Sequence, residues 1–408
     1  MAKKSNAVVI PVGKHGLSKD KMDQDALKII EKLESAGYQA FLVGGCIRDL
    51  IAGKQPKDTD IVTNARPEQI KRVFKRGIII GRRFPLVHVR IPGKKYKVIE
   101  VATFRTKFAD YKSDFKLLHW LTKFFVYGNI DQDAERRDLT VQAMYWRLSD
   151  AAILDYHSGY EHAKSGQIKV IGLPEQRFAE DPVRILRVLR VMAKLGFNID
   201  KETHSAILAS RSLLQNVSAA RMFGEVLRSF HGGFGRDFAR LMIRYKIHNT
   251  IFPGAIISKK TEKWLYVALT EADDRYKQGM SLSAGYLLSV ILWPIYFKLN
   301  AKNKRFSKKN ALKVIMRQHR ATVMPKKHIQ MIEAIWRLQP MLINNLSVEK
   351  ASKLMHAQYF KAAYDFLLLR SKFNSDIAVY ADKWTDFLAL DEESRKQFSF
   401  EELISEHD

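Results

Sequence analysis

The chain has 408 residues, of which 46% are hydrophobic and 27% charged, and this composition is typical of a multidomain globular protein and excludes a disordered or fibrous one. Lys and Arg number 69 against 43 Asp and Glu, so the formal net charge is +26. Such an excess favours a nucleic-acid partner over the alternatives of solubility alone or a membrane surface. The single cysteine, Cys46, excludes an intramolecular disulfide framework and a multi-cysteine zinc site.

Nothing in the sequence indicates secretion or a membrane span. The first residues lack the apolar stretch of a secretory signal, and the most apolar window, 287–299, is too short to cross a bilayer and contains Pro294. We therefore expect a soluble, cytoplasmic protein with no membrane partner.

The first third of the chain reads as a mixture of helices and strands. Residues 1–22 are polar and rich in lysine, and we expect a mobile basic arm there. From residue 23 to about 154, apolar runs bounded by Gly, Pro and Asp predict five strands and two helices. The predicted strands are Gln39–Val43, Asp60–Thr63, Ile78–Ile80, Val87–Ile91 and Val98–Phe104, and the helices are Ala26–Ala36 and Pro67–Lys75.

From Glu180 onward strand signals nearly vanish and apolar residues recur at helical spacing. The predicted helices are Pro182–Lys194, Thr203–Ser210, Ala219–Phe230, Arg236–Tyr245, Glu262–Glu271, Ser283–Lys298, Lys309–Met316, Lys327–Gln339, Val348–Met355 and Phe360–Ser371. The expected organisation is an α/β head over 23–154, a helical neck over 155–255 and a helical body over 256–408. The fold class is therefore α+β.

Two glycines and two aspartates form the sharpest local pattern. A strand-like run ends at Gly44 and Gly45 and passes into a short helix that carries Arg48. Paired glycines let the backbone approach a phosphate, and a helix N-terminus supplies N–H donors to it. Asp58 and Asp60 are two residues apart on the expected next strand, so both face the same side and can hold a pair of Mg²⁺ ions. Taken separately, the glycine pair could be an ordinary turn and the aspartate pair a solvated loop. Taken together, the two pairs favour a phosphate- and metal-binding site.

A third acid, Glu100, interrupts the apolar run of residues 98–104. Support of the metal face and a buried ion pair with Arg105 are equally compatible with its position. Both readings stay open at the level of sequence.

Taken together, the motifs resemble the class II nucleotidyltransferases, which comprise bacterial poly(A) polymerases and CCA-adding tRNA nucleotidyltransferases. The chain carries the family's motifs in the family's order, from about Gly37 to about Ser371. These are Gly44-Gly45-x-x-Arg48-Asp49 with Asp58-x-Asp60, Asp133-x-x-Arg136-Arg137-Asp138, Glu180-Asp181-Pro182-Val183-Arg184 continuing through Arg187 to Arg190, and Ala220-Arg221-Met222-Phe223-Gly224-Glu225.

The resemblance implies a polymerase-beta-like head with a mixed sheet and a role for each matched residue. Asp58 and Asp60 would bind the two Mg²⁺ ions and, with Asp138, act as catalytic acids. Gly44, Gly45, Arg48 and Arg137 would hold the sugar and triphosphate of ATP. Asp181 and Arg184 would read the base, with Arg187 and Arg190 beside the nucleotide. The three-residue steps between these last four place them along one helix face, although a solvated face would look the same.

Three segments favour the poly(A) branch: 79–89, 324–339 and 362–370, each of which resembles that branch more than the CCA-adding one. Two departures from the family pattern are Gln142, where the family has Asn, and Cys46, where it has a third glycine. Residues 108–127 are unusually apolar, with Trp120, Phe124 and Phe125 among lysines. We expect this segment to pack on the head, with a docking surface for a protein partner or a membrane as the alternative.

The predicted activity is therefore transfer of AMP from ATP to RNA 3′ ends without a template. Basic residues of the body should contact the RNA backbone, namely Lys309, Arg317, Arg320, Lys326 and Lys327. The alternatives are a CCA-adding or A-adding tRNA enzyme, transfer to a small molecule, and a non-catalytic RNA-binding protein.

Overall fold

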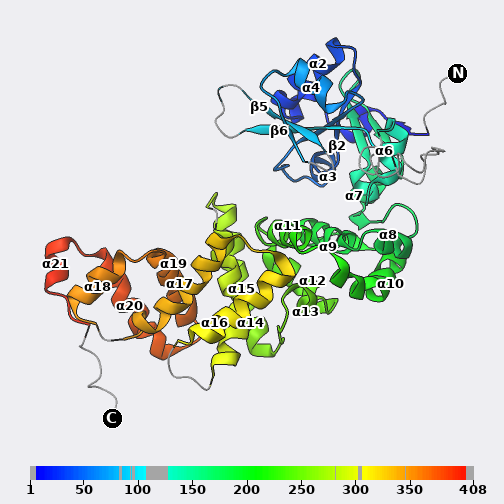
Figure 1. Ribbon diagram of the computed structural model, residues 1–408. Coiled ribbons are helices and arrows are strands. Elements are labelled where there is room, and N and C mark those ends of the chain that lie inside the picture. The colour runs from blue at the N-terminus through cyan, green and yellow to red at the C-terminus, as the bar shows by residue number, and fades with distance from the viewer. Residues whose placement is uncertain are drawn as a thin grey trace, which may run out of the picture. The chain divides into compact units, whose positions relative to one another are not determined.

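The computed structural model describes residues 6–81, 85–91, 93, 97–106, 127–280, 282–301, 306–344 and 346–400 (Figure 1). The chain forms two compact units, Met1–Ser210 and Arg211–Asp408. The boundary falls inside the predicted neck of residues 155–255, which therefore contributes to both units. An α+β first unit followed by a helical second unit confirms the predicted fold class.

The first unit is built on a mixed sheet. Its described residues contribute eight strands in the order β1-β8-β7-β2-β3-β6-β5-β4, in which β3 and β6 run parallel and the other neighbours antiparallel. The strands are β1 Val8–Ile10, β2 Ala40–Val43, β3 Asp60–Thr63, β4 Ile78–Ile80, β5 Leu86–Arg90, β6 Val98–Thr103, β7 Met144–Arg147 and β8 Ile153–Asp155. All five predicted strands are confirmed; β1, β7 and β8 were not predicted.

Helices cover both faces of this sheet. Figure 1 shows α2 and α4 together on one side, and α3 next to α7 on the other. The helices are α1 Val12–His15, α2 Gln24–Ser35, α3 Gly45–Ile51, α4 Pro67–Val73, α6 Ile130–Arg136, α7 Gly159–Lys164, α8 Pro174–Glu180, α9 Val183–Leu195 and α10 Lys201–Ser210, with 3₁₀ turns at Lys19–Lys21 and Thr140–Gln142. A two-stranded ribbon, β9 Gln167–Ile168 and β10 Asn198–Ile199, lies beside them.

The N-terminal segment corrects one prediction. The described part of the predicted mobile arm, residues 6–22, packs on the head. Val8–Ile10 pairs with β8 as an edge strand, and the carbonyl oxygen of buried Leu17 accepts a 3.0 Å hydrogen bond from the indole N–H of Trp146. The average polarity of the segment hid a short apolar run, Ala7-Val8-Val9-Ile10, which satisfies an otherwise open sheet edge.

The second unit is helical throughout its described residues. Its helices are α11 Ala219–Phe230, α12 Gly235–Arg244, α13 His248–Ile251, α14 Lys259–Lys277, α15 Ala284–Asn300, α16 Lys308–Thr322, α17 Lys326–Leu342, α18 Val348–Met355, α19 Phe360–Ser371, α20 Ser375–Ala389 and α21 Glu392–Lys396, preceded by a 3₁₀ turn at Arg211–Asn216. All predicted helices of this region are confirmed, whereas α13, α20 and α21 were not predicted. Large aromatic side chains lie in its core; Trp336, Phe366 and Trp384 are fully buried.

In the described part of the chain no helix is long and apolar enough to span a bilayer. The apolar window 287–299 lies inside α15, whose residues pack against α14, α16 and α17. The predicted packing or docking role of residues 108–127 falls, apart from Tyr127, outside the described residues.

Candidate active site

The glycine pair lies where β2 turns into α3. Gly44 has φ +81° and ψ −125°, a conformation that only glycine adopts without strain, and it caps the first turn of α3. A Cβ atom at Gly44 would stand 3.7 Å from Nη1 of Arg137, and one at Gly45 would stand 3.4 Å from Nη2 of Arg48. Two guanidinium groups therefore approach the glycine turn.

Asp60 is the first residue of β3 and lies beside Glu100 in the parallel pairing of β3 with β6. Paired positions of adjacent strands face the same side, so the two carboxylates share one face of the sheet. The residue is exposed as a whole, yet neighbouring atoms crowd its carboxyl group. This desolvation, together with the negative charges of Glu100 and Asp58, raises the pKa of Asp60 to about 6 against the opposing charge of Arg137.

Asp58 precedes β3 in an exposed loop and is not on the strand, as its spacing had suggested. Its charge nevertheless reaches Asp60 and contributes to the raised pKa of that group. Asp58 and Asp60 are thus brought together by the loop rather than by strand alternation.

Glu100 pairs with a histidine rather than with Arg105. Its Oε1 lies 3.1 Å from Nε2 of His88 on β5, the partner strand on its other side. The main-chain N–H of Arg105 donates instead to Oδ1 of Asp133 at 3.2 Å. Of the two readings left open by the sequence, the structure favours support of the Asp60 face.

A buried ion network around Asp133 holds Arg137 in place. Asp133 is fully buried; its Oδ1 accepts from Arg136, and its Oδ2 accepts from Nε and Nη2 of Arg137 at 3.0 and 2.8 Å and from the Tyr145 hydroxyl at 2.8 Å. Burial alone would raise the pKa of Asp133, but the charges of Arg137 and Arg136 outweigh it and lower the pKa to about 2. The remaining Arg137 nitrogen, Nη1, donates to the carbonyl of Gln142 at 3.3 Å.

Sequence reasoning gave Asp133 no role of its own. The spacing could have revealed one, because an acid three and four residues before two arginines on a helix can contact both. Gln142 takes part through its main-chain carbonyl, which any residue at that position would supply.

Asp138 lies with the arginines of α9. Its Oδ1 accepts from Nε of Arg184 at 2.7 Å and its Oδ2 from Nη1 of Arg187 at 2.5 Å. Burial by itself would raise the pKa of Asp138, but the charges of Arg187 and Arg184 hold it below its usual range. The carboxylate therefore fixes the direction of both guanidinium groups, and its predicted role as a catalytic acid stays a prediction.

Asp181 is not on the arginine-bearing helix. It caps the end of α8 with extended backbone, φ −150°, because the following Pro182 disfavours a helical residue before it. Its Oδ1 accepts from the N–H of Val183 at 3.3 Å, so it stands at the start of α9. Arg184, Arg187 and Arg190 do follow at three-residue steps along that helix.

Two further contacts, which the sequence did not single out, attach α8 and α9 to the head. Arg177 is buried and its Nη2 donates to the carbonyl oxygens of Arg136 and Arg137, each at 2.9 Å. Asp49 is buried and its Oδ2 accepts from Nζ of Lys194 at 2.6 Å. A single charged residue inside a helical segment looks the same in the sequence whether it makes such a buried contact or lies on a solvated helix face.

Arg48 lies over the glycine turn but is already engaged. Its Nε and Nη2 donate to Oδ1 of Asp49 at 2.9 and 2.7 Å, and the side chain is buried. Its Nη1 is buried without a hydrogen-bond partner in the described structure. One donor of the predicted triphosphate contact is thus unsatisfied.

Cys46 is a buried residue of α3, and burial together with the charge of Asp60 raises the pKa of its thiol to about 12. It is a packing residue rather than a nucleophile.

Among the described residues, no three His, Cys, Asp or Glu side chains form a ready-made metal cluster. Mg²⁺ does not need one, since it commonly takes one or two carboxylates and completes its shell with substrate phosphates and water. Desolvation and the negative charges of Glu100 and Asp58 raise the pKa of Asp60, and a divalent cation would favour its charged form. The donors present therefore fit Mg²⁺ held by Asp58 and Asp60.

Comparison with known proteins identifies similar sequences over most of the chain. Residues 40–169 match a family model described as "Poly A polymerase head domain", residues 196–256 one described as "Probable RNA and SrmB- binding site of polymerase A", and residues 303–405 one described as "Polymerase A arginine-rich C-terminus". The chain is 35% identical to poly(A) polymerase I of Haemophilus influenzae over 395 residues, which is 92% of this chain and 86% of that protein.

CCA-adding enzymes are similar over a shorter part. The Bacillus subtilis CCA-adding enzyme is 32% identical over 253 residues, 61% of each chain. A crystal structure of the Bacillus stearothermophilus CCA-adding enzyme in complex with CTP superposes with a TM-score of 0.64 at 23% identity, over 89% of this chain and 81% of that one. This structural likeness shows a shared fold: the predicted nucleotidyltransferase head with a helical body is confirmed.

Proposed function

The chain belongs to the poly(A) polymerase family, and we propose that it transfers AMP from ATP to the 3′ ends of RNA without a template. It is an enzyme, a polynucleotide adenylyltransferase, as its relatives over most of its length indicate. One observation carries the assignment of the site: Gly44, Asp60 and Arg137, from three separate segments, converge at one end of the sheet. A phosphate-accepting turn, a carboxylate and a guanidinium in one place suit a triphosphate with its metal ions.

In the proposed reaction the RNA 3′-hydroxyl gives up its proton to water, its oxygen forms a bond to the α-phosphorus of ATP, and the bond from that phosphorus to the bridging oxygen breaks, releasing pyrophosphate. Mg²⁺ held by Asp58 and Asp60 would supply activation of the 3′-hydroxyl and neutralisation of the leaving group. The chain itself contributes a rigid cradle. Arg137 is held by Asp133 and Tyr145, so its charge does not have to reorganise when negative charge develops.

Selection of the base is assigned to the start of α9. Asp181 offers a carboxylate acceptor and Arg184 a planar donor fork, the two groups that can pair with the edge of a base. Asp138 restrains Arg184 and Arg187 through both carboxylate oxygens, which limits the orientations available to these arginines. We assign Arg48 and Gly45 to the triphosphate and Arg190 to the surroundings of the nucleotide.

RNA would be held mainly through its phosphates by the basic second unit, so binding should weaken steeply with salt. We place the reaction in the cytoplasm, where RNA 3′ ends and ATP meet. Nucleotide and RNA choice distinguish tail synthesis from CCA addition, so they are the first properties to measure.

The test is primer extension with one nucleoside triphosphate at a time, on an unstructured RNA and on a tRNA that lacks its 3′ CCA. Long ladders with ATP on the unstructured RNA are expected. Addition of two cytidylates and one adenylate to the tRNA alone would replace the proposal with a CCA-adding enzyme. Asp58→Ala should abolish extension and leave the melting temperature unchanged, whereas Glu31→Ala, an exposed acid on α2, should behave as wild type. Wild-type extension by the Asp58→Ala protein would refute the metal assignment.

A further inference from the structure

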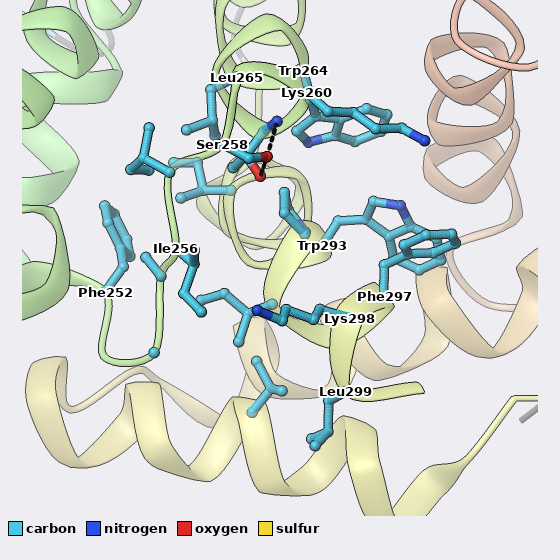
Figure 2. Close-up of a pocket in the computed structure, with 18 of the residues that line it drawn as sticks. Phe252, Ile256, Ser258, Lys260, Trp264, Leu265, Trp293, Phe297, Lys298 and Leu299 are labelled. Atoms are coloured by element: carbon cyan, nitrogen blue, oxygen red, sulfur yellow. Dashed lines mark hydrogen bonds between the residues drawn. The ribbon is translucent and has the colours of Figure 1, made fainter. Parts of the chain in front are cut away.

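A cavity of about 660 Å³ opens within the second unit and is lined only by residues of that unit. It lies between the segment that precedes α14 and the C-terminal half of α15, with α16 and α19 adding further walls. Figure 2 shows Trp264, Trp293 and Phe297 on one side, Phe252 and Ile256 on the other, and Lys298 extending between them. Its volume is that of a site for a small molecule or a nucleotide-sized group.

Pro294 helps to shape the cavity. A proline inside a helix cannot donate to the carbonyl four residues earlier, which leaves the carbonyl of Val290 in α15 without its helical partner. The indole N–H of Trp264 donates to this carbonyl at 2.9 Å. The bond holds the ring of Trp264 in place, so this wall of the cavity is preformed.

A partly buried cation, Arg370, lies at the same cavity, and no acid of the described structure pairs with it. The guanidinium of Arg370 stacks over Trp293 at 5.1 Å and donates to Oε1 of Gln339 at 3.0 Å. Burial lowers the pKa of Arg370 to about 10, and no acid of the described structure offsets this. A partly desolvated cation of this kind is stabilised by an anionic ligand.

The mouth of the cavity adds more positive charge and exposed aromatic surface. Phe297 is 56% exposed and Ile256 57%, although both are large apolar side chains. Lys260, Lys298, Lys313 and Arg317 also line the cavity, and its described lining residues include no Asp or Glu. Two different features, an apolar interior and a uniformly basic rim, therefore occur together.

We propose that this cavity binds an unstacked nucleobase of single-stranded RNA, with the adjoining phosphates on the basic rim. Aromatic platforms flanked by cations are the means by which proteins hold single strands without reading sequence. A protein partner would meet five cations around the apolar surface and would have to be acidic there, whereas RNA supplies both a flat apolar base and negative charge at fixed spacing. The inference rests on RNA being the substrate and adds a second point of contact, remote in sequence from the catalytic residues.

The first experiment measures binding of a short fluorescein-labelled oligoadenylate by anisotropy. Phe297→Ala removes an exposed ring and Lys298→Ala an exposed cation, so both proteins should remain folded, which their melting curves would verify. We expect Phe297→Ala to weaken binding about fivefold or more, the effect of losing one stacking platform. Lys298→Ala should reduce the salt slope by about 0.7, the value for one phosphate contact to a single strand.

Matched controls are exposed residues of the same unit outside the cavity. Val379→Ala on α20 removes an exposed apolar side chain, and Lys361→Ala on α19 removes an exposed cation. Both should bind oligoadenylate as wild type does. Equal effects of the cavity variants and their controls would overturn the proposal.

Ultraviolet cross-linking followed by peptide mapping locates the contact directly. Cross-links in peptides that contain Trp293 or Phe297 are expected, and cross-links confined to other peptides would overturn the inference. Binding of oleate that oligoadenylate does not displace would also overturn it and identify a site for lipophilic anions. Asp58→Ala separates the two proposals, because it should abolish AMP transfer while leaving these cross-links intact.

Discussion

The strongest test of the site's architecture is to remove the charge of Asp133. Asn at this position keeps the shape of the side chain but leaves Arg137, whose side chain is only 17% exposed, without its anionic partner. Asp150 offers a matched comparison, since Arg147 also contacts it through Nε and Nη2, at 2.9 and 2.6 Å, and its pKa is likewise lowered to about 2. The two acids differ in exposure, since the side chain of Asp150 is 47% exposed and that of Asp133 0%, and Asp133 has Arg136 and Tyr145 as additional partners.

The expected effects differ because burial decides how much an ion pair contributes. Lowering the pKa of Asp133 from 3.8 to about 2 corresponds to about 2 kcal/mol of stabilisation. Breaking a buried pair on one side costs more, about 3 to 5 kcal/mol, because the other charge remains buried. Solvent screens the exposed Asp150 pair, so Asp150→Asn should cost less than about 1 kcal/mol.

Thermal unfolding at neutral pH measures both variants. A loss of about 3 kcal/mol in a unit of this size lowers the melting temperature by about 6 to 12 °C for Asp133→Asn, against about 4 °C or less for Asp150→Asn. Because the pKa of Asp133 is lowered in the folded protein, its contribution to the free energy of unfolding is fully present above about pH 4 and is lost as the pH falls through about 2. Melting of both variants within 1 °C of each other would refute the reasoning.

Three other predictions concern the site. Asp60→Asn should abolish AMP transfer yet melt in EDTA at or above the wild-type temperature, because burial near Glu100 disfavours the charged carboxylate. In EDTA the wild-type protein should lose stability as the pH rises from about 4 to about 6 and Asp60 becomes charged. A variant that melts below the wild type in EDTA would contradict this prediction. Asp138→Asn should reduce the kcat/KM preference for ATP over CTP about tenfold, the effect of one charge-assisted hydrogen bond to Arg184; an unchanged preference would remove Asp138 from base selection. Gly44→Ala should lower the free energy of unfolding in urea by about 1 to 2 kcal/mol, and Gly45→Ala should leave it almost unchanged, because of the two only Gly44 has a positive φ. Equal losses in the two variants would contradict the strain argument.

The elements that were predicted correctly carry their signal in local sequence. β2, β3, β4, β5 and β6 are apolar runs bounded by turn residues, and the helices of the second unit repeat apolar residues at helical spacing. The strands that were missed, β7 and β8, follow each other closely with Ala151-Ala152 between them, and β1 lies in a lysine-rich segment. Their strand character depends on the neighbours with which they pair.

The sequence predicted which residues form the site but not which of them contact one another. The motifs brought Gly44, Asp60, Arg137 and Arg184 into one hypothesis, and the structure gathers them in one unit. It placed Asp58 and Asp181 outside the regular elements on which their spacing had put them. An inference from spacing requires that one strand or helix covers all the spaced residues. The strand β3 begins only after Asp58, and Pro182 separates Asp181 from the helix α9.

The sequence by itself determined the fold class, the order of the motifs and the chemistry of the residues available, because periodicity, turn residues and residue type are local properties. Only the tertiary structure decided which charges meet. Asp138 holds two arginines some fifty residues further along the chain, Asp49 accepts from Lys194, and Trp264 satisfies the carbonyl that Pro294 leaves open. Such pairings join residues far apart in the chain, and their strength comes from burial, which exists only once the chain has folded.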